Sequence, residues 1–79
     1  MAICSYLAIP RNGAANDLEA QLAALPGCEV TRAVNREVFL LVTETAEEEE
    51  EAALQEAFKR LPGLAALILT FGELDRENR

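Results

Sequence analysis

The sequence predicts an α+β domain with the element order β-α-β-β-α-β, and two observations support this prediction. The first is a repeated stop, "LPG" at residues 25–27 and 61–63, each preceded by an apolar i, i+4, i+7 series typical of an amphipathic helix. The second is that short apolar runs, bounded by turn residues, flank each of these helices, as expected for strands. The chain therefore contains one β-α-β unit twice, which is the ferredoxin-like pattern.

The first half of the chain contains a strand, a helix and a second strand. Residues 3–9 form a short apolar run that ends at "PRNG", so we expect a strand there. We expect a helix over residues 14–25, with Leu18, Leu22 and Leu25 on its buried face and Asn16 as a cap of its first turn. A second strand over residues 28–34 follows the Pro-Gly stop.

The second half repeats this pattern. The turn "VNRE" joins the second strand to a third over residues 38–42 as a hairpin, and its unbroken apolar run indicates a strand central in the sheet or covered on both faces. A capping box of Thr45 and Glu48 is expected to begin the second helix, which runs to Leu61. The negative charge of Glu47–Glu51 is favourable at this helix N-terminus, and we assign the run no further role.

A fourth strand over residues 64–71 completes the predicted domain. The length allows one hydrophobic core, so we expect a single domain over residues 1–79, with an ordered core over about 3–74 and a frayed tail over 75–79. Because Leu25 and Leu61 each close an apolar series before a Pro-Gly stop, we expect them to be equivalent core positions.

The predicted fold leaves one face of the sheet without cover. Right-handed crossovers place both helices on one side of a four-stranded antiparallel sheet. Alternation gives every strand two rows of side chains, and both rows of the first and fourth strands are largely apolar. In the fourth strand we expect Leu67, Leu69 and Phe71 on one side and residues 66, 68 and 70 on the other. An apolar, uncovered sheet face implies a partner.

Composition and charge limit the partners. Fourteen acidic and seven basic side chains give a net charge of −7, which repels a phosphate backbone, so we expect no nucleic acid. A cationic peptide or protein would be attracted by the same field. No apolar stretch approaches the roughly 20 residues of a membrane span, and the N-terminus lacks the features of a secretory signal. We therefore expect a cytoplasmic protein without stable membrane insertion.

The residues that usually carry catalysis or bind metals are scarce. The sequence has no histidine, and Cys4 and Cys28 are isolated, so we expect no metal site and no cofactor. We also expect no disulfide, because the first and second strands are not neighbours in a ferredoxin-like sheet. Two alternatives remain at this stage: a small hydrolase that binds an anion through Arg11, and a regulatory small-molecule-binding or dimerisation domain.

Three segments of the chain together resemble one known family. These are "ICSYLAI" at residues 3–9, "PGCEV" at 26–30 and "LPGLAALILTF" at 61–71, and with them the chain resembles the NapD family over about residues 3–74. The resemblance implies a cytoplasmic chaperone without catalytic activity, which binds the twin-arginine signal peptide of a periplasmic nitrate reductase precursor. It also implies that export of the catalytic subunit is delayed until the molybdenum cofactor is inserted.

The predicted binding site lies on the uncovered face. If the helices cover Cys4, Tyr6, Leu67 and Leu69, the opposite rows form an apolar floor on which Ser5 and Thr70 offer hydroxyl groups. Glu29 on the outer second strand is a candidate partner for a peptide arginine. The predicted peptide-binding residues are Ile3, Ser5, Leu7, Ile68, Thr70 and Glu29. We expect the protein to be a monomer.

Overall fold

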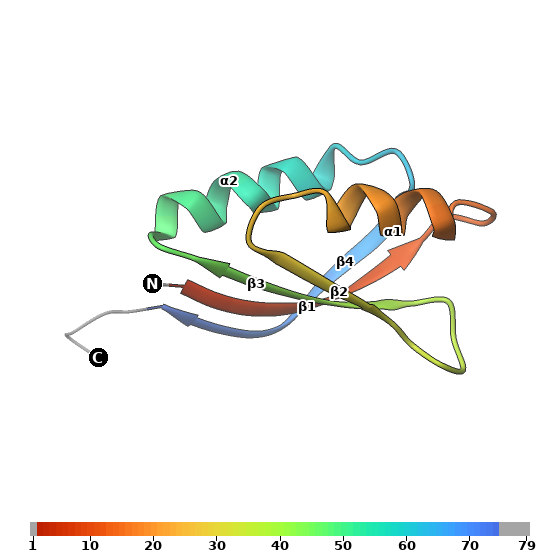
Figure 1. Cartoon of the computed structure of the whole chain (residues 1–79), viewed down its shortest axis with the longest axis horizontal. Coiled ribbons are helices and arrows are strands. Elements are labelled where there is room, and N and C mark those ends of the chain that lie inside the picture. The colour runs from red at the N-terminus through yellow and green to blue at the C-terminus, as the bar shows by residue number, and fades with distance from the viewer. Residues whose placement is uncertain (1, 75–79) are drawn as a thin grey trace.

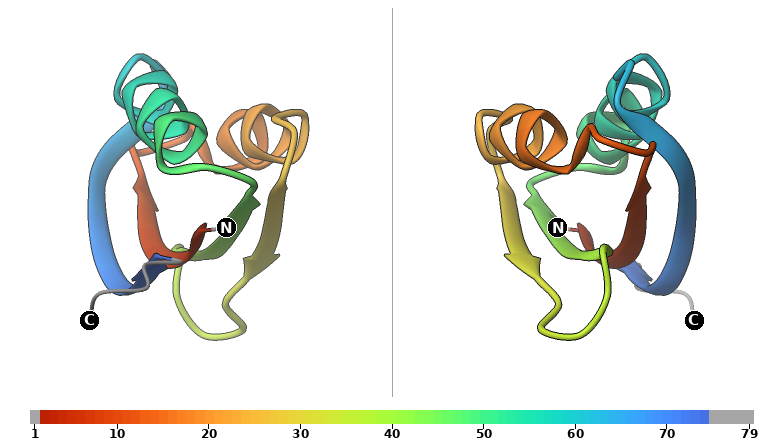
Figure 2. Two further views of the ribbon diagram at one scale, coloured as in Figure 1. Left: turned by 90° about the vertical axis from the view of Figure 1, so that its left-hand side faces the viewer. Right: turned by 90° about the vertical axis from the view of Figure 1, so that its right-hand side faces the viewer.

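Four antiparallel strands form one sheet, and two helices pack on one of its faces (Figure 1). The computed structural model describes residues 2–74, so the predicted tail over 75–79 lies outside the described residues. The elements are β1 (Ala2–Pro10), α1 (Ala15–Ala23), β2 (Cys28–Arg32), β3 (Phe39–Thr45), α2 (Glu48–Lys59) and β4 (Leu64–Leu74). The strand order β2-β3-β1-β4 confirms the ferredoxin-like fold. Figure 2 shows both helices on the same side of the curved sheet, and the opposite face carries no helix.

The core lies between the helices and the sheet. Apolar side chains at helical spacing on α1 and α2 meet every second side chain of β1 and β3. Tyr6 contacts Phe58 edge to face, with ring centroids 5.6 Å apart. The buried cluster consists of Cys4, Tyr6, Ala8, Ala15, Leu18, Leu22, Phe39, Leu41, Leu54 and Phe58. Within residues 2–74, no helix is long and apolar enough to cross a membrane.

Both helices end earlier than predicted, and this changes the role of two leucines. α1 ends at Ala23 and α2 at Lys59, so Leu25 and Leu61 each lie in the turn that follows. Their backbone N–H groups donate to the carbonyls of Leu22 and Phe58 at 3.2 and 3.1 Å. The two leucines are equivalent, as predicted, but they are partly exposed and pack against the core rather than within it.

The predicted helix caps are wrong at both N-termini. Asn16 lies inside α1, and its side chain accepts a hydrogen bond from Arg32 at 3.1 Å. Thr45 is the last residue of β3 and is buried, so its hydroxyl faces the core instead of the N-terminus of α2. The residue before α2 is Glu47, and it makes no side-chain cap hydrogen bond.

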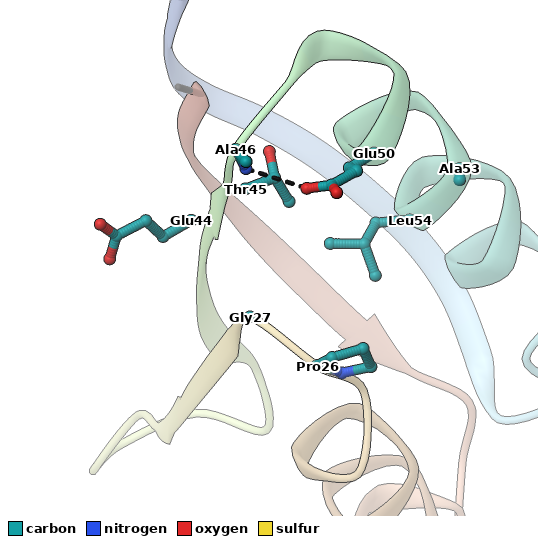
Figure 3. Close-up of a pocket in the computed structure, with 8 residues that line it drawn as sticks. All are labelled: Pro26, Gly27, Glu44, Thr45, Ala46, Glu50, Ala53 and Leu54. Atoms are coloured by element: carbon teal, nitrogen blue, oxygen red, sulfur yellow. Dashed lines mark hydrogen bonds between the residues drawn. The ribbon is translucent and has the colours of Figure 1, made fainter.

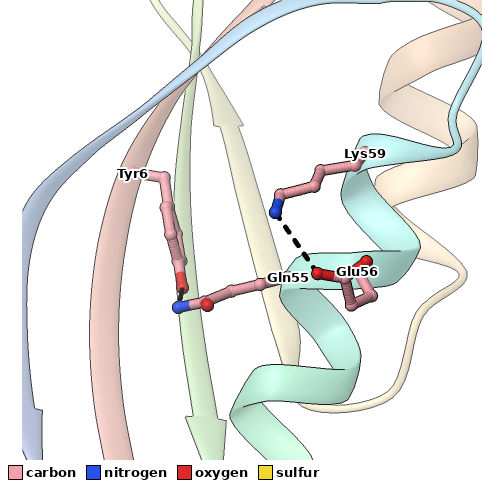
Figure 4. Close-up of polar contacts among 4 residues, drawn as sticks. All are labelled: Tyr6, Gln55, Glu56 and Lys59. Carbon is pink, nitrogen blue, oxygen red and sulfur yellow. Dashed lines mark hydrogen bonds and ion pairs between the residues drawn. The ribbon is translucent and has the colours of Figure 1, made fainter.

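One glutamate of the acidic run is buried between α2 and the sheet. Glu51 is 3% exposed and accepts hydrogen bonds from three hydroxyl groups, those of Tyr6 at 2.6 Å, Thr43 at 2.7 and 2.8 Å, and Thr45 at 3.2 Å. Gln55 donates to the same tyrosine hydroxyl at 2.9 Å (Figure 4). Burial, and then the bond to Glu51, raise the pKa of Tyr6. The buried carboxylate therefore joins α2 to both central strands.

The Pro-Gly stop after α1 requires a glycine for two reasons. Gly27 has φ +75°, a conformation that side chains disfavour, and a Cβ atom there would lie 2.7 Å from the carbonyl oxygen of Glu44. The backbone N–H of Glu44 donates to the Gly27 carbonyl at 2.9 Å, which extends the contact between β2 and β3 by one step. The close approach of the two backbones thus explains why the turn contains glycine.

The hairpin and the positions of the two cysteine-containing strands in the sheet agree with the predictions. β2 and β3 pair antiparallel, and Ala33 donates to the carbonyl of Val38 at 3.0 Å across the loop that joins them. β2 and β1 are separated by β3, and both Cys4 and Cys28 are free thiols. Burial raises the pKa of Cys28 to about 11.

Candidate functional site

The uncovered face of the sheet is formed by alternate residues of all four strands. Residues directly opposite each other in an antiparallel pair project to the same side, so the register identifies this face. Ile3, Ser5, Leu7 and Ile9 of β1 are partly exposed, whereas the residues between them are buried under the helices. Their neighbours on the same face are Glu29 and Thr31 of β2, Leu40, Val42 and Glu44 of β3, and Ala66, Ile68 and Phe71 of β4.

The centre of this face is an apolar surface. Leu7 pairs with Leu40 on one side and with Ile68 on the other. Leu40 is 45% exposed and Ile68 is 47% exposed, which is unusual for aliphatic side chains in the middle of a sheet face. The structure therefore brings the predicted residues Ile3, Leu7 and Ile68 together on one face.

Ser5 and Thr70 lie next to each other on this face, but they bond mainly to one another. Their hydroxyl oxygens are 2.7 Å apart, and the Thr70 hydroxyl donates to the Ser5 carbonyl at 2.9 Å. The Ser5 hydroxyl then donates to Thr70, so both hydroxyl hydrogens are used within the protein. In the free protein the hydroxyl groups that we expect to face a peptide therefore have their oxygen lone pairs, rather than their hydrogens, open to a partner.

A β-bulge at Thr70 adds an aromatic side chain to the face. The register shifts between Ser5 and Tyr6: Tyr6 pairs with Leu69, but Ser5 pairs with Phe71. The extra residue reverses the alternation, so Phe71 lies on the uncovered face rather than beside Leu69 as predicted. Phe71 is 53% exposed.

On the face of the sheet that carries the helices, one residue of the edge strand β4 is more exposed than predicted. Leu67 packs against the core, as expected, but Leu69 is 56% exposed although it pairs with the buried Tyr6. β4 is the outermost strand on this side, and the helices do not cover Leu69. Leu69 thus lies on the predicted side of the sheet, but it is exposed rather than buried.

Two glutamates lie near one end of the uncovered face. Glu29, on the edge strand β2, pairs with Val42, and Glu44 pairs with Ile3. Both are exposed, and with Gly27, Cys28 and Val42 they line a cavity of about 300 Å³. The structure thus places the predicted residue Glu29 two strands away from β1, but next to a second carboxylate that the sequence analysis did not identify.

Basic side chains are held elsewhere in the described part of the chain. Arg32 projects to the helix side, where it contacts Asn16 and Glu19 and lies 5.2 Å from the ring centre of Phe39. Arg11 donates to the carbonyl of Pro62 at 3.1 Å and so connects two loops. Among the side chains that the structure describes on the uncovered face, the only charged ones are acidic.

A second cavity lies on the helix side, where the turn before β2 meets the end of β3 and the first turns of α2 (Figure 3). Its volume is about 430 Å³, and Pro26, Leu54 and Ala53 contribute apolar walls. The Glu50 carboxylate accepts a hydrogen bond from the backbone N–H of Ala46 at 2.9 Å, which fixes the start of α2. Residues 2–74 contain no group of three or more acidic, cysteine or histidine side chains that would hold a metal ion.

A family model described as NapD protein matches residues 1–76, almost the entire chain. The chain belongs to the NapD family. This confirms the resemblance seen in the sequence and makes the protein a member of a chaperone family rather than an enzyme family. The alternative of a hydrolase that uses Arg11 is therefore wrong. No curated protein sequence matches this NapD family member significantly.

A solved structure supports the same assignment. The solution structure of the Escherichia coli Tat proofreading chaperone protein NapD superimposes with a TM-score of 0.76 and 26% sequence identity. The match covers 98% of this chain and 81% of that chain. The ferredoxin-like arrangement of this NapD family member is thus found in a chaperone of the same family.

Proposed function

We propose that this protein is a proofreading chaperone that binds a twin-arginine signal peptide on the uncovered face of its sheet. The observation that carries the proposal is the exposed apolar surface centred on Leu7, with Leu40, Ile68 and Phe71 each about half exposed. Apolar clusters of this kind are rare on a surface without a partner. The family membership and the E. coli chaperone structure support a peptide as that partner.

The charge of the protein fits the same partner. A twin-arginine signal peptide carries its cations before an apolar segment, and this protein combines a net charge of −7 with an apolar face. Electrostatic attraction would accelerate the encounter, and burial of the apolar segment would supply most of the affinity. We extend the proposal to the client: a periplasmic nitrate reductase catalytic subunit, whose export is delayed in the cytoplasm until its molybdenum cofactor is inserted.

The proposal can be tested by titration calorimetry with a synthetic twin-arginine peptide. Ile68→Lys places a charge in the middle of the proposed surface, and we expect it to abolish measurable binding. Ile68 is a better choice than Leu7, because Leu7 is more buried and its replacement risks the fold. The matched control is Val34→Lys, since Val34 is 95% exposed in the hairpin loop and the change in charge is identical.

The outcomes separate this function from the remaining alternative. Circular dichroism should show that both variants fold, and the mass of the free protein in solution should be that of a monomer. Equal peptide affinity of the two variants would exclude the uncovered face as the site. A stable dimer that does not bind the peptide would support a dimerisation domain instead, since two apolar sheet faces can also cover each other.

A further inference from the structure

The charges on the uncovered face lie towards one end, and this gives the surface a direction. In the β3 row of this face, Glu44 lies at one end and Leu40 at the other, with Val42 between them. At about 3.3 Å per residue, Glu44 is about 13 Å from Leu40 along the strand, and we call the end with Glu44 the carboxylate end. Beyond Val42, the residues of this face that lie side by side across the strands are apolar apart from Thr31. Leu7 and Ile68 lie beside Leu40, and Ile9 pairs with Ala66 further along.

The carboxylate end has the chemistry to hold an arginine side chain. The cavity of about 300 Å³ there is lined by the apolar side chain of Val42, by Gly27 and Cys28, and by the two acidic side chains of Glu29 and Glu44. An arginine stem can pack on an apolar floor while its guanidinium pairs with carboxylates. Within residues 2–74, neither Glu29 nor Glu44 has a side-chain hydrogen bond or ion pair, so both carboxylates are available to a ligand.

We infer that the signal peptide binds in one orientation, with its arginine pair at Glu29 and Glu44 and its apolar segment directed towards Leu40 and Ile68. This inference rests on the proposed function and adds the position of the arginines to it. The reverse orientation would place two cations on the apolar end of the face and leave both carboxylates without a partner. Charge complementarity therefore selects one direction along the strands.

Charge reversal tests this orientation. Glu44→Arg and Glu29→Arg should each weaken binding of the twin-arginine peptide at least tenfold more than Glu37→Arg, a control with the same charge change in the exposed loop that joins β2 and β3. A peptide in which both arginines are replaced by glutamate should bind the double variant Glu29→Arg, Glu44→Arg more tightly than it binds the wild type. The variants Glu29→Gln and Glu44→Gln provide a smaller change, in case charge reversal disturbs the fold.

A second measurement uses the wild-type protein and needs no variant. A nitroxide label next to the arginines of the peptide should broaden the NMR signals of Gly27 and Val42, whereas a label at the end of the apolar segment should broaden those of Leu40 and Ile68. The opposite pattern, or an equal effect of Glu44→Arg and Glu37→Arg, would overturn the orientation while the proposed function stands. Absence of peptide binding to the wild type would overturn both.

Discussion

The buried carboxylate of Glu51 offers the sharpest test of how the helix layer is held on the sheet. Glu51→Gln preserves the shape of the side chain but replaces one acceptor oxygen by an NH₂ donor. Three hydroxyl groups, those of Tyr6, Thr43 and Thr45, donate to this carboxylate at 2.6 to 3.2 Å. In the variant, the NH₂ group of the glutamine faces hydroxyl donors at a buried site. The negative charge that strengthened these hydrogen bonds is also removed.

The expected loss of stability follows from these contacts. A hydrogen bond to a charged group contributes about 1.5–3 kcal/mol, and the substitution weakens at least two such bonds. Removal of the charge also removes a desolvation cost, which offsets part of this loss. We therefore expect Glu51→Gln to lower the free energy of unfolding by about 2–4 kcal/mol. A domain of this size has a total of about 4–12 kcal/mol, so the effect should be large.

The assay is urea denaturation followed by circular dichroism, with Glu49→Gln as the control. Glu49 is exposed in the first turn of α2 and loses the same charge, so its substitution should change stability by less than about 0.5 kcal/mol. If the free energies of unfolding of Glu51→Gln and Glu49→Gln differ by less than this amount, the contacts between the hydroxyl groups and the carboxylate do not stabilise the fold.

Four further substitutions test the packing, a titrating thiol and the turn, each by urea denaturation. Leu22→Ala should cost about 2–5 kcal/mol because Leu22 is fully buried, and Leu25→Ala about half as much because Leu25 is partly exposed; equal costs would contradict this difference. Burial, and then the charge of Glu51, raise the pKa of Cys28 from 9.0 to about 11. The protonated thiol therefore contributes its full stabilisation below pH 9, and this stabilisation is lost as the pH rises through about 11. Cys28→Ala should therefore reduce the fall in stability between pH 9 and 11, and an unchanged slope would argue against this linkage. Gly27→Ala should cost at least about 2 kcal/mol, because of the positive φ and the 2.7 Å approach of a Cβ atom to a backbone oxygen, and a fully stable variant would show that neither feature requires glycine in this turn.

The fold was predictable from the sequence because its signals are local and repeated. Apolar side chains at helical spacing before each Pro-Gly stop, with Leu18 and Leu22 now fully buried in α1, were sufficient to identify the helices. Thr45 was misinterpreted as a helix cap, because its acceptor is not a neighbouring backbone group but Glu51. A signal for this contact was present: Glu51 precedes Leu54 by three positions and Phe58 by seven, so it shares their buried helix face.

The uncovered face was predicted only in part. Alternation along β1 placed Ile3, Ser5 and Leu7 in one row, because a regular strand has a period of two, and the structure shows that this row faces away from the helices. It failed for Phe71, because the bulge in β4 inserts one residue. It also missed Leu40, since the run around it is apolar on both faces and alternation is then invisible.

Methyl-selective NMR can show whether a twin-arginine signal peptide lies on the apolar face of the sheet. On titration with the peptide, we expect intermolecular NOEs from the apolar segment of the peptide to the methyl groups of Leu7, Leu40 and Ile68. The methyl groups of Leu18 and Leu22, buried under the helices, should show none. NOEs confined to the helix side, or a titration without NOEs to the uncovered face, would exclude that face as the binding site.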